Sequence, residues 1–141
     1  MTRIVPSLTF VTLLAVGMAF MGCADTQSRQ EPLSTIVPIS EIKNVAGKWA
    51  GIAKRRPPAG SDNWLEVTIK EDGAYEFSSF RTIGAAAGSG RLTLQDGKLM
   101  SESDKGSATY TLYDRGGKRV LVFEATMKDG VRYSADLKPA K

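Results

Sequence analysis

Histidine and cysteine supply many of the nucleophiles, general bases and metal ligands of proteins, and this chain has almost none of either. Its 141 residues include no histidine and a single cysteine, Cys23. Without histidine the chain has no Ser-His-Asp or Cys-His nucleophile, no imidazole acid or base and no His-ligated metal site. A lone cysteine cannot form a disulfide within the chain. We therefore expect no metal and no other cofactor.

The acidic residues are the remaining candidates for catalysis, and their positions favour other roles. One group stands in short glycine turns, where Asp side chains hydrogen-bond the local backbone: Asp72, Asp96, Asp114 and Asp129. A second group alternates with apolar residues, so that it faces water across a strand: Glu66, Glu76, Glu124 and Asp136. We predict that the protein is not an enzyme.

Residues 84–90 read Gly-Ala-Ala-Ala-Gly-Ser-Gly, a glycine content that suits a phosphate-binding loop. No lysine follows the last glycine and no helical pattern begins there, so the usual phosphate-binding groups are missing. We expect a flexible connection between strands, placed to gate a barrel mouth or to insert into a partner protein. Lys54-Arg55-Arg56 is the main basic run and predicts a solvated loop. Because the other basic residues are scattered among acids, nucleic acid is not an expected partner.

The first 22 residues have the parts of a secretory signal. Arg3 supplies a positive start, residues 4–21 carry no charge, and the small Gly22 precedes Cys23. Residues 20–23, Phe-Met-Gly-Cys, resemble the lipobox of bacterial lipoproteins. The resemblance implies cleavage before Cys23, fatty acylation of Cys23 (palmitate or a similar chain) and a firm membrane anchor. Ala24, where many inner-membrane lipoproteins carry Asp, implies the periplasmic face of the outer membrane. The alternatives are a cleaved soluble protein and a retained membrane anchor.

Residues 23–44 are predicted to be the lipidated N-terminus and a flexible tether, because their first part is polar and poor in large apolar residues. From residue 45 to the end, at residue 141, apolar residues recur with the period of strands rather than helices. Asp-Gly and Gly-Gly turns separate the runs, which is typical of hairpins. Eight strands are predicted, at residues 48–53, 64–70, 74–78, 91–95, 98–101, 107–113, 119–125 and 131–137.

Short connections make neighbouring strands antiparallel, since parallel pairing needs a long crossover. A meander of this size has exposed edges unless it closes. We therefore predict an all-β fold: a small antiparallel up-and-down meander of about eight strands that closes into a barrel and has no C-terminal helix. An open, curved sheet or a sandwich is the alternative.

Gly47-Lys48-Trp49, at the start of this meander, resembles the Gly-x-Trp motif of lipocalins and related small barrels. The resemblance implies a lipocalin-like barrel in which Trp49 plugs one end and a basic residue near the last strand packs across its ring. Arg132 is the preferred partner for its planar stacking, and Lys138 is the alternative. By alternation Trp64 faces away from the apolar side of its strand, so we expect Trp49 to be buried and Trp64 exposed.

Five aromatic residues on the predicted inner face could form a site for a small hydrophobic or lipid-like ligand at the end opposite Trp49: Tyr75, Phe77, Tyr110, Phe123 and Tyr133. An eight-stranded barrel is also narrow enough for its own side chains to fill it. The sequence thus favours a membrane-anchored, ligand-binding envelope protein. The alternatives are a protein-binding module, such as an inhibitor of proteases or lysozyme, and a structural envelope component without a pocket.

Overall fold

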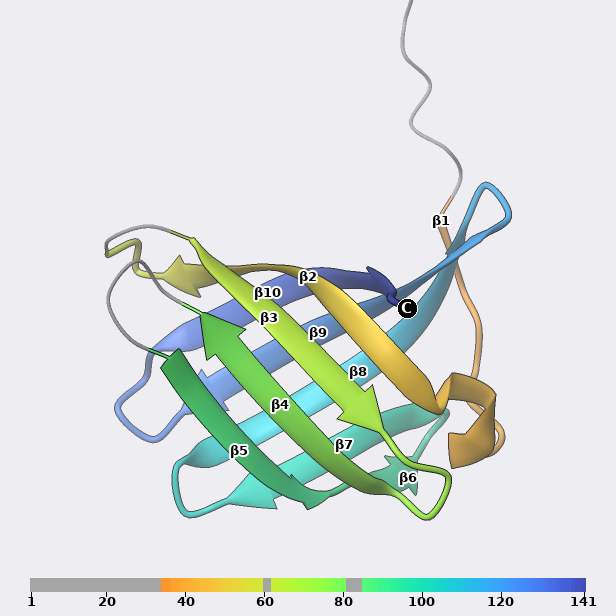
Figure 1. Cartoon of the computed structure of the whole chain (residues 1–141), viewed down its shortest axis with the longest axis horizontal. Helices are drawn as coiled ribbons and strands as arrows, with labels where there is room; N and C mark the ends of the chain where they lie inside the picture. The colour runs from red at the N-terminus through yellow and green to blue at the C-terminus, as the bar shows by residue number, and fades with distance from the viewer. Residues whose placement is uncertain (1–33, 60–61, 81–84) are drawn as a thin grey trace, which may run out of the picture. The chain divides into compact units, whose positions relative to one another are not determined.

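The structure is a computed structural model that describes residues 34–59, 62–80 and 85–141. Within these ranges the chain folds into ten strands and one short 3-10 helix, η1 (Figure 1). The elements are β1 (Ser34–Ile36), η1 (Ile42–Val45), β2 (Gly47–Arg56), β3 (Asn63–Ile69), β4 (Ala74–Phe80), β5 (Ala85–Arg91), β6 (Thr93–Gln95), β7 (Lys98–Ser103), β8 (Gly106–Arg115), β9 (Lys118–Met127) and β10 (Arg132–Pro139). Cys23 and the predicted lipobox lie outside the described residues.

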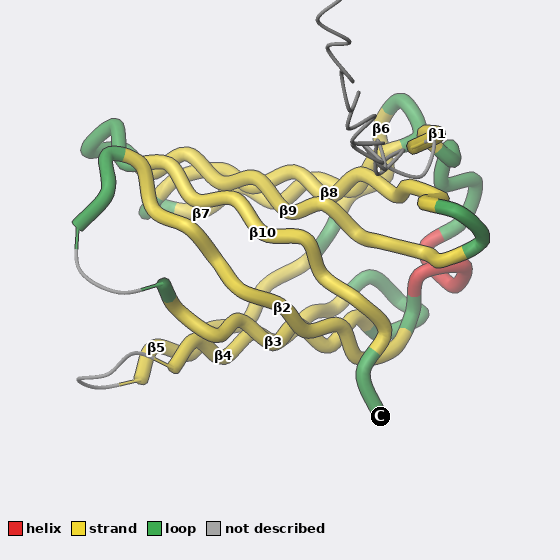
Figure 2. The backbone as a smooth tube through the Cα atoms, turned by 90° about the horizontal axis from the view of Figure 1, so that it is seen from above, coloured by secondary structure: helices red, strands yellow, loops and turns green. Residues whose placement is uncertain are grey.

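All ten strands belong to one antiparallel sheet, in the order β5-β4-β3-β2-β10-β9-β8-β7-β6, with β1 added beside β8. The pairing of β2 with β10 joins the two halves of the meander, whereas β5 and β6 end the sheet without pairing with each other. The sheet therefore curls into a nearly closed barrel, whose two walls Figure 2 shows from above. This confirms the predicted all-β, antiparallel, up-and-down fold, and β10 ends the chain without a helix after it.

The predicted turn aspartates do fix the hairpins. Asp72, Asp114 and Asp129 each accept a hydrogen bond from a backbone N–H two or three residues further on, at 2.7–3.0 Å. Asp96 takes the left-handed conformation (φ 50°) beside Gly97 (φ 73°), as a tight two-residue hairpin between β6 and β7 requires. The side chains of Asp72, Asp114 and Asp129 are therefore occupied with the local backbone.

The segment before the predicted domain differs from its predicted organisation. Residues 34–44 were expected to belong to a tether, yet β1 pairs with β8 from Ser34↔Arg115 to Ile36↔Tyr113. Ile39 and Val45, on either side of the turn into η1, are only 2% and 1% exposed. The tether prediction is wrong for residues 34–44, because β1 joins the sheet and Ile39 is buried in the core, which average polarity did not reveal.

The glycine-rich stretch also differs from the prediction. Residues 85–91 form strand β5 and not a flexible loop, and they pair with β4 along its whole length. An added Cβ at Gly88 would lie 2.5 Å from Phe77 Cε1, and one at Gly90 would lie 2.9 Å from Tyr75 Cε1. The two rings thus occupy the space that side chains on β5 would need, and this packing overrides the weak strand propensity of Ala and Gly.

The basic partner of Trp49 is Arg119, not Arg132. The Arg119 guanidinium carbon lies 5.8 Å from the centre of the Trp49 ring. Arg132 starts β10 opposite Arg56, whereas Pro139 at the other end of β10 pairs with Trp49. Because β9 runs antiparallel to β10, its first residues lie at the end of the barrel where Trp49 sits. Lys138 pairs with Ala50 and its side chain is exposed.

Trp49 and Trp64 behave as predicted, with exposures of 3% and 44%. The Trp49 Nε1–H donates a hydrogen bond to the Val45 carbonyl oxygen at 2.8 Å, which ties the barrel to η1. The basic run at residues 54–56 is the last part of β2 and not a loop. In the part of the chain that the structure describes, no helix is long and apolar enough to cross a membrane.

Candidate functional site

The inner face of the barrel changes character along its axis. Toward the Trp49 end it carries large aliphatic side chains that are at most 5% exposed: Leu65, Val67, Ile69, Leu99, Leu112, Leu121 and Leu137. Toward the opposite end, which we call the far end, alternation places small residues on the same face: Ala53, Ser101, Ala108, Ala125 and Ala135. Large side chains thus fill one half of the interior, while small ones line the other.

Between these two halves lies a band of aromatic rings, which we call the aromatic band: Tyr75, Phe77, Tyr110 and Phe123. The Tyr75 and Phe77 rings stack with centroids 6.5 Å apart, and Tyr75 meets the edge of Tyr110 at 6.4 Å. Tyr110 and Phe123 are 5.2 Å apart, on paired positions of β8 and β9. The band therefore bridges the interior from β4 to β8 and β9.

Four of the five predicted ligand-binding residues come together in this band, but not all at the far end. Tyr75 is the second residue of β4 and lies nearer the Trp49 end. Tyr133 stands apart from the band, half-buried at the start of β10 between Arg55 and Ala125. Alternation along the strands correctly predicted that all five side chains face inward, but it could not predict their positions along the barrel axis.

Partial exposure distinguishes three residues of the aromatic band from the aliphatic core. Tyr75, Phe77 and Phe123 face inward and pack against the core, yet each keeps part of its surface accessible. Tyr110 is only 2% exposed. Burial raises the pKa of the Tyr110 phenol above its usual range, and the neighbouring Tyr75 phenol adds to this shift. Tyr110 therefore stays neutral at physiological pH.

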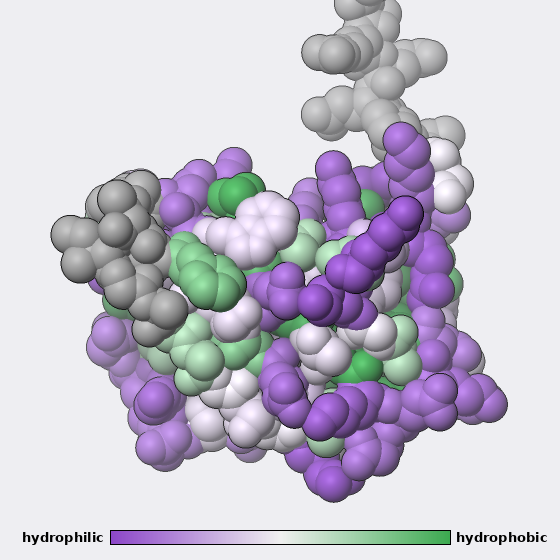
Figure 3. Space-filling view, in the orientation of Figure 1, coloured by the Kyte–Doolittle hydropathy of each residue, from purple (hydrophilic) through white to green (hydrophobic). Residues whose placement is uncertain are grey.

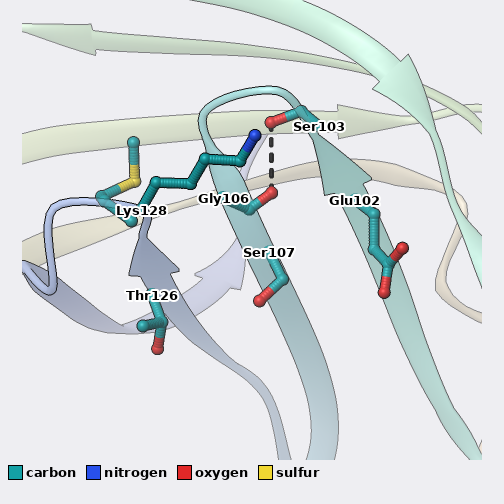
Figure 4. Close-up of a pocket in the computed structure, with 7 residues that line it drawn as sticks. Glu102, Ser103, Gly106, Ser107, Thr126 and Lys128 are labelled. Carbon is teal, nitrogen blue, oxygen red and sulfur yellow. Dashed lines mark hydrogen bonds between the residues drawn. The ribbon is translucent and has the colours of Figure 1, made fainter.

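Two recesses in the described surface lie outside the barrel. The first, of about 250 Å³, is shown in Figure 4 beside the β7–β8 hairpin, where Ser103 Oγ donates to the Gly106 carbonyl oxygen at 3.2 Å. Glu102, Ser107 and Lys128 also line it, so it is polar and shallow. The second, of about 490 Å³, lies on the outer face of β3, β4 and β5. Neither is lined mainly by the aromatic band.

Two glutamates on β3 and β4 are engaged in ion pairs. Glu66 Oε1 lies 3.3 Å from Lys48 Nζ, and Glu76 Oε1 lies 2.7 Å from Lys70 Nζ. Hydrogen bonding to Glu76 is the main cause that raises the pKa of Lys70. Among residues 34–59, 62–80 and 85–141, no group of three or more acidic residues is placed to hold a metal ion.

Two features of the interior were missed from the sequence. The sequence contained a signal for Arg119. It follows the Gly116-Gly117 turn, so it stands at the start of the strand that pairs with the last one. Gly88 and Gly90 carried none, since their role depends on rings from the preceding strand. No protein-family model matches the sequence, and searches of curated proteins and of solved structures gave no match.

Proposed function

We propose that the protein is a non-enzymatic lipoprotein of the bacterial envelope whose β-domain binds a small hydrophobic or lipid-like ligand. The observation that carries the proposal is the aromatic band, in which three of the four inward-facing residues keep accessible surface, next to an inner face of small residues. Sites for small apolar ligands are concave, mostly apolar and oriented by a few polar groups. The Tyr133 hydroxyl, toward the far end, would supply such a group.

The far half of the barrel interior is the proposed seat of the ligand. Trp49 and the aliphatic residues fill the other half, so a ligand enters from the far end and stops at the rings of Phe77 and Phe123. Aromatic rings offer large apolar area, and small residues such as Ala108 leave room beside it. The hydrophobic effect then favours the ligand over water at the exposed ring faces.

A cavity-filling substitution tests this proposal. Ala108 faces inward on β8, opposite Ala125 on β9 and Ser101 on β7, whereas its neighbour Thr109 faces outward. A naphthalene-type fluorescent probe should bind the full chain with a dissociation constant on the order of micromolar. Ala108→Leu should weaken binding at least tenfold with little change in stability, and Thr109→Leu should not.

The outcome separates a site from a packed core. If the far half is already filled, the extra methyl groups of Ala108→Leu overpack it and cost about 1–3 kcal/mol of unfolding free energy. A destabilised Ala108→Leu variant, or an absence of saturable probe binding to the unaltered chain, would rule out the ligand site. The predicted insertion of residues 84–90 into a partner protein is not proposed, since residues 85–90 lie in β5.

The anchor is tested separately, at Cys23. Cleavage and acylation at this residue would hold the domain at the membrane, on the periplasmic face of the outer membrane if Ala24 directs sorting. Replacing Cys23 with Ser should abolish labelling by a palmitate analogue and leave an uncleaved precursor. Ser28→Cys in the Cys23→Ser background controls for cysteine content, and it should not restore labelling. Label retained by the Cys23→Ser variant would disprove the lipoprotein assignment.

A further inference from the structure

The outer face of β2, β3 and β4 carries a row of exposed apolar side chains, which we call the outer row: Ile52, Trp64 and Phe80. The register pairs Ile52 with Trp64 and Trp64 with Phe80, so the three lie side by side across adjacent strands. Their exposures are 46%, 44% and 54%. Figure 3 shows this face, with pale and green side chains over β3 and β4. Alternation turns these three positions outward, but nothing in the fold of the described residues requires them to be apolar.

A polar recess begins next to the outer row on the same face. Its volume is about 490 Å³, and strands β3, β4 and β5 supply its walls. Glu66 and Ser78, a cross-strand pair, follow Trp64 and Phe80 at a spacing of two residues, which is about 7 Å along a strand. Thr68 and Glu76 form the next pair. The exposed aromatic side chains of the outer row thus lie next to a recess lined by hydroxyl and carboxylate groups.

The charges of the recess are balanced. Each glutamate has its own lysine, Lys48 for Glu66 and Lys70 for Glu76, and all four side chains are at least a third exposed. The recess therefore offers hydrogen-bond donors and acceptors without a net field that would select an anion or a cation. Its chemistry suits a neutral, polar ligand.

The apolar area of the outer row is too small for a protein partner. A large aromatic side chain offers roughly 150–250 Å² of surface, so three half-exposed side chains present roughly 200–350 Å². A stable protein interface takes about 800 Å² from each partner. A flat, elongated molecule with apolar ring faces and a polar rim fits both the area and the chemistry.

We propose that this outer face binds a neutral polysaccharide chain of pyranose rings. One sugar stacks its apolar C–H face on Trp64 and Phe80, and the next extends over the recess, where its hydroxyl groups hydrogen-bond with Glu66, Ser78 and Thr68. Phe77 of the inner aromatic band also borders the recess, but the sugar contacts proposed here use only outward-facing side chains.

Tryptophan fluorescence offers a direct test, because Trp64 is exposed while Trp49 is buried. The full chain is titrated with chitohexaose and, separately, with cellohexaose, which lacks N-acetyl groups. We expect saturable changes in emission with a dissociation constant on the order of 0.1–1 mM for at least one of them. The better of the two identifies whether N-acetyl groups are recognised.

Variants on and off the face complete the test, with binding followed by calorimetry. Trp64→Ala and Phe80→Ala should each weaken binding about tenfold or more, and Ser78→Ala by a smaller factor. Leu94→Ala, which removes an exposed apolar side chain on β6, is the matched control and should bind normally. Thermal unfolding shows that each variant is folded.

Two results would overturn the proposal. One is that neither hexasaccharide binds at millimolar concentration. The other is that binding persists unchanged in Trp64→Ala. Sedimentation of the full chain and of Trp64→Ala provides the remaining comparison: self-association that depends on Trp64, without sugar binding, would assign the outer row to a second copy of the chain instead.

Discussion

The two halves of the barrel interior are lined by side chains of different size. At the Trp49 end, Leu and Val side chains and an indole ring fill the space, and η1 closes it through the Trp49–Val45 hydrogen bond. At the far end the inner face carries mainly alanine and serine, together with Tyr133 and the buried Asn63. One continuous sheet thus encloses a packed core and a region lined by small residues. A barrel wall does not require a uniform interior, and stability and binding can be assigned to different halves of one small domain.

The largest effect should come from the packed half. Trp49→Ala removes a ring that is 3% exposed and contacts the core, so we expect a loss of about 3–5 kcal/mol in the free energy of unfolding. Trp64→Ala, at 44% exposure, should change it by less than about 0.5 kcal/mol. Urea unfolding of both variants measures the difference. Similar midpoints for the two would mean that Trp49 is not the main support of this end.

The aromatic band should show an intermediate effect at Gly88. An alanine there places a Cβ against Phe77 Cε1, which must move, and overpacking of this kind costs about 1–3 kcal/mol. Gly88→Ala combined with Phe77→Leu should recover part of that cost, since the smaller side chain vacates the clash. Ser89→Ala, on the outer face of the same strand, is the control. If Gly88→Ala is as stable as the unaltered chain, the packing of the Tyr75 and Phe77 rings does not require glycine on β5.

The sequence predicted the parts of the fold that local patterns determine. Alternation and Asp-Gly turns gave most of the strands, and the inward phase of Phe77, Tyr110 and Phe123 followed from them. The Gly-x-Trp string placed Trp49 correctly. Strand β5 was missed because its stability comes from the Tyr75 and Phe77 rings rather than from its own residues. Such dependence on another strand leaves no signal in a local window.

The height of residues along the barrel was equally inaccessible from the sequence. Tyr133 and Tyr75 share the inner face, yet they lie toward opposite ends. Arg132 was chosen for Trp49 because it stands near the last strand, but the direction of β10 carries it to the far end. Periodicity gives the face of a strand, whereas register and direction decide which side chains meet.

A pH effect should separate Tyr110 from the other tyrosines. Its phenol has a raised pKa in the folded state because it is buried, while the unfolded chain titrates near the ordinary value of 10.0. The unfolded state therefore loses a proton first as pH rises, and the stability that burial of the neutral phenol provides falls above pH 10. Between pH 9 and pH 11 the unaltered chain should lose about 1.4 kcal/mol more than Tyr110→Phe. Tyr113→Phe is the control, and equal losses in all three proteins would contradict the burial of a neutral Tyr110.

The smallest expected effect distinguishes Arg119 from Arg132 and tests which basic residue supports the packed half. The Arg119 guanidinium lies over the Trp49 ring and also hydrogen-bonds the Asn44 carbonyl oxygen, so it joins β9 to both the plug and η1. Because the side chain is exposed, the cation–π contact should contribute only about 0.5–1 kcal/mol. Arg119→Ala should therefore lower the free energy of unfolding by about that amount, and Arg119→Lys should recover part of it. Arg132→Ala, at the far end, should leave it unchanged within about 0.5 kcal/mol.

In the Trp49→Ala background Arg119→Ala should cost less, since the ring is gone, and a double-mutant cycle in urea measures this coupling. A coupling of zero would mean that Arg119 acts through Asn44 alone, and that η1 rather than the indole ring holds it in place.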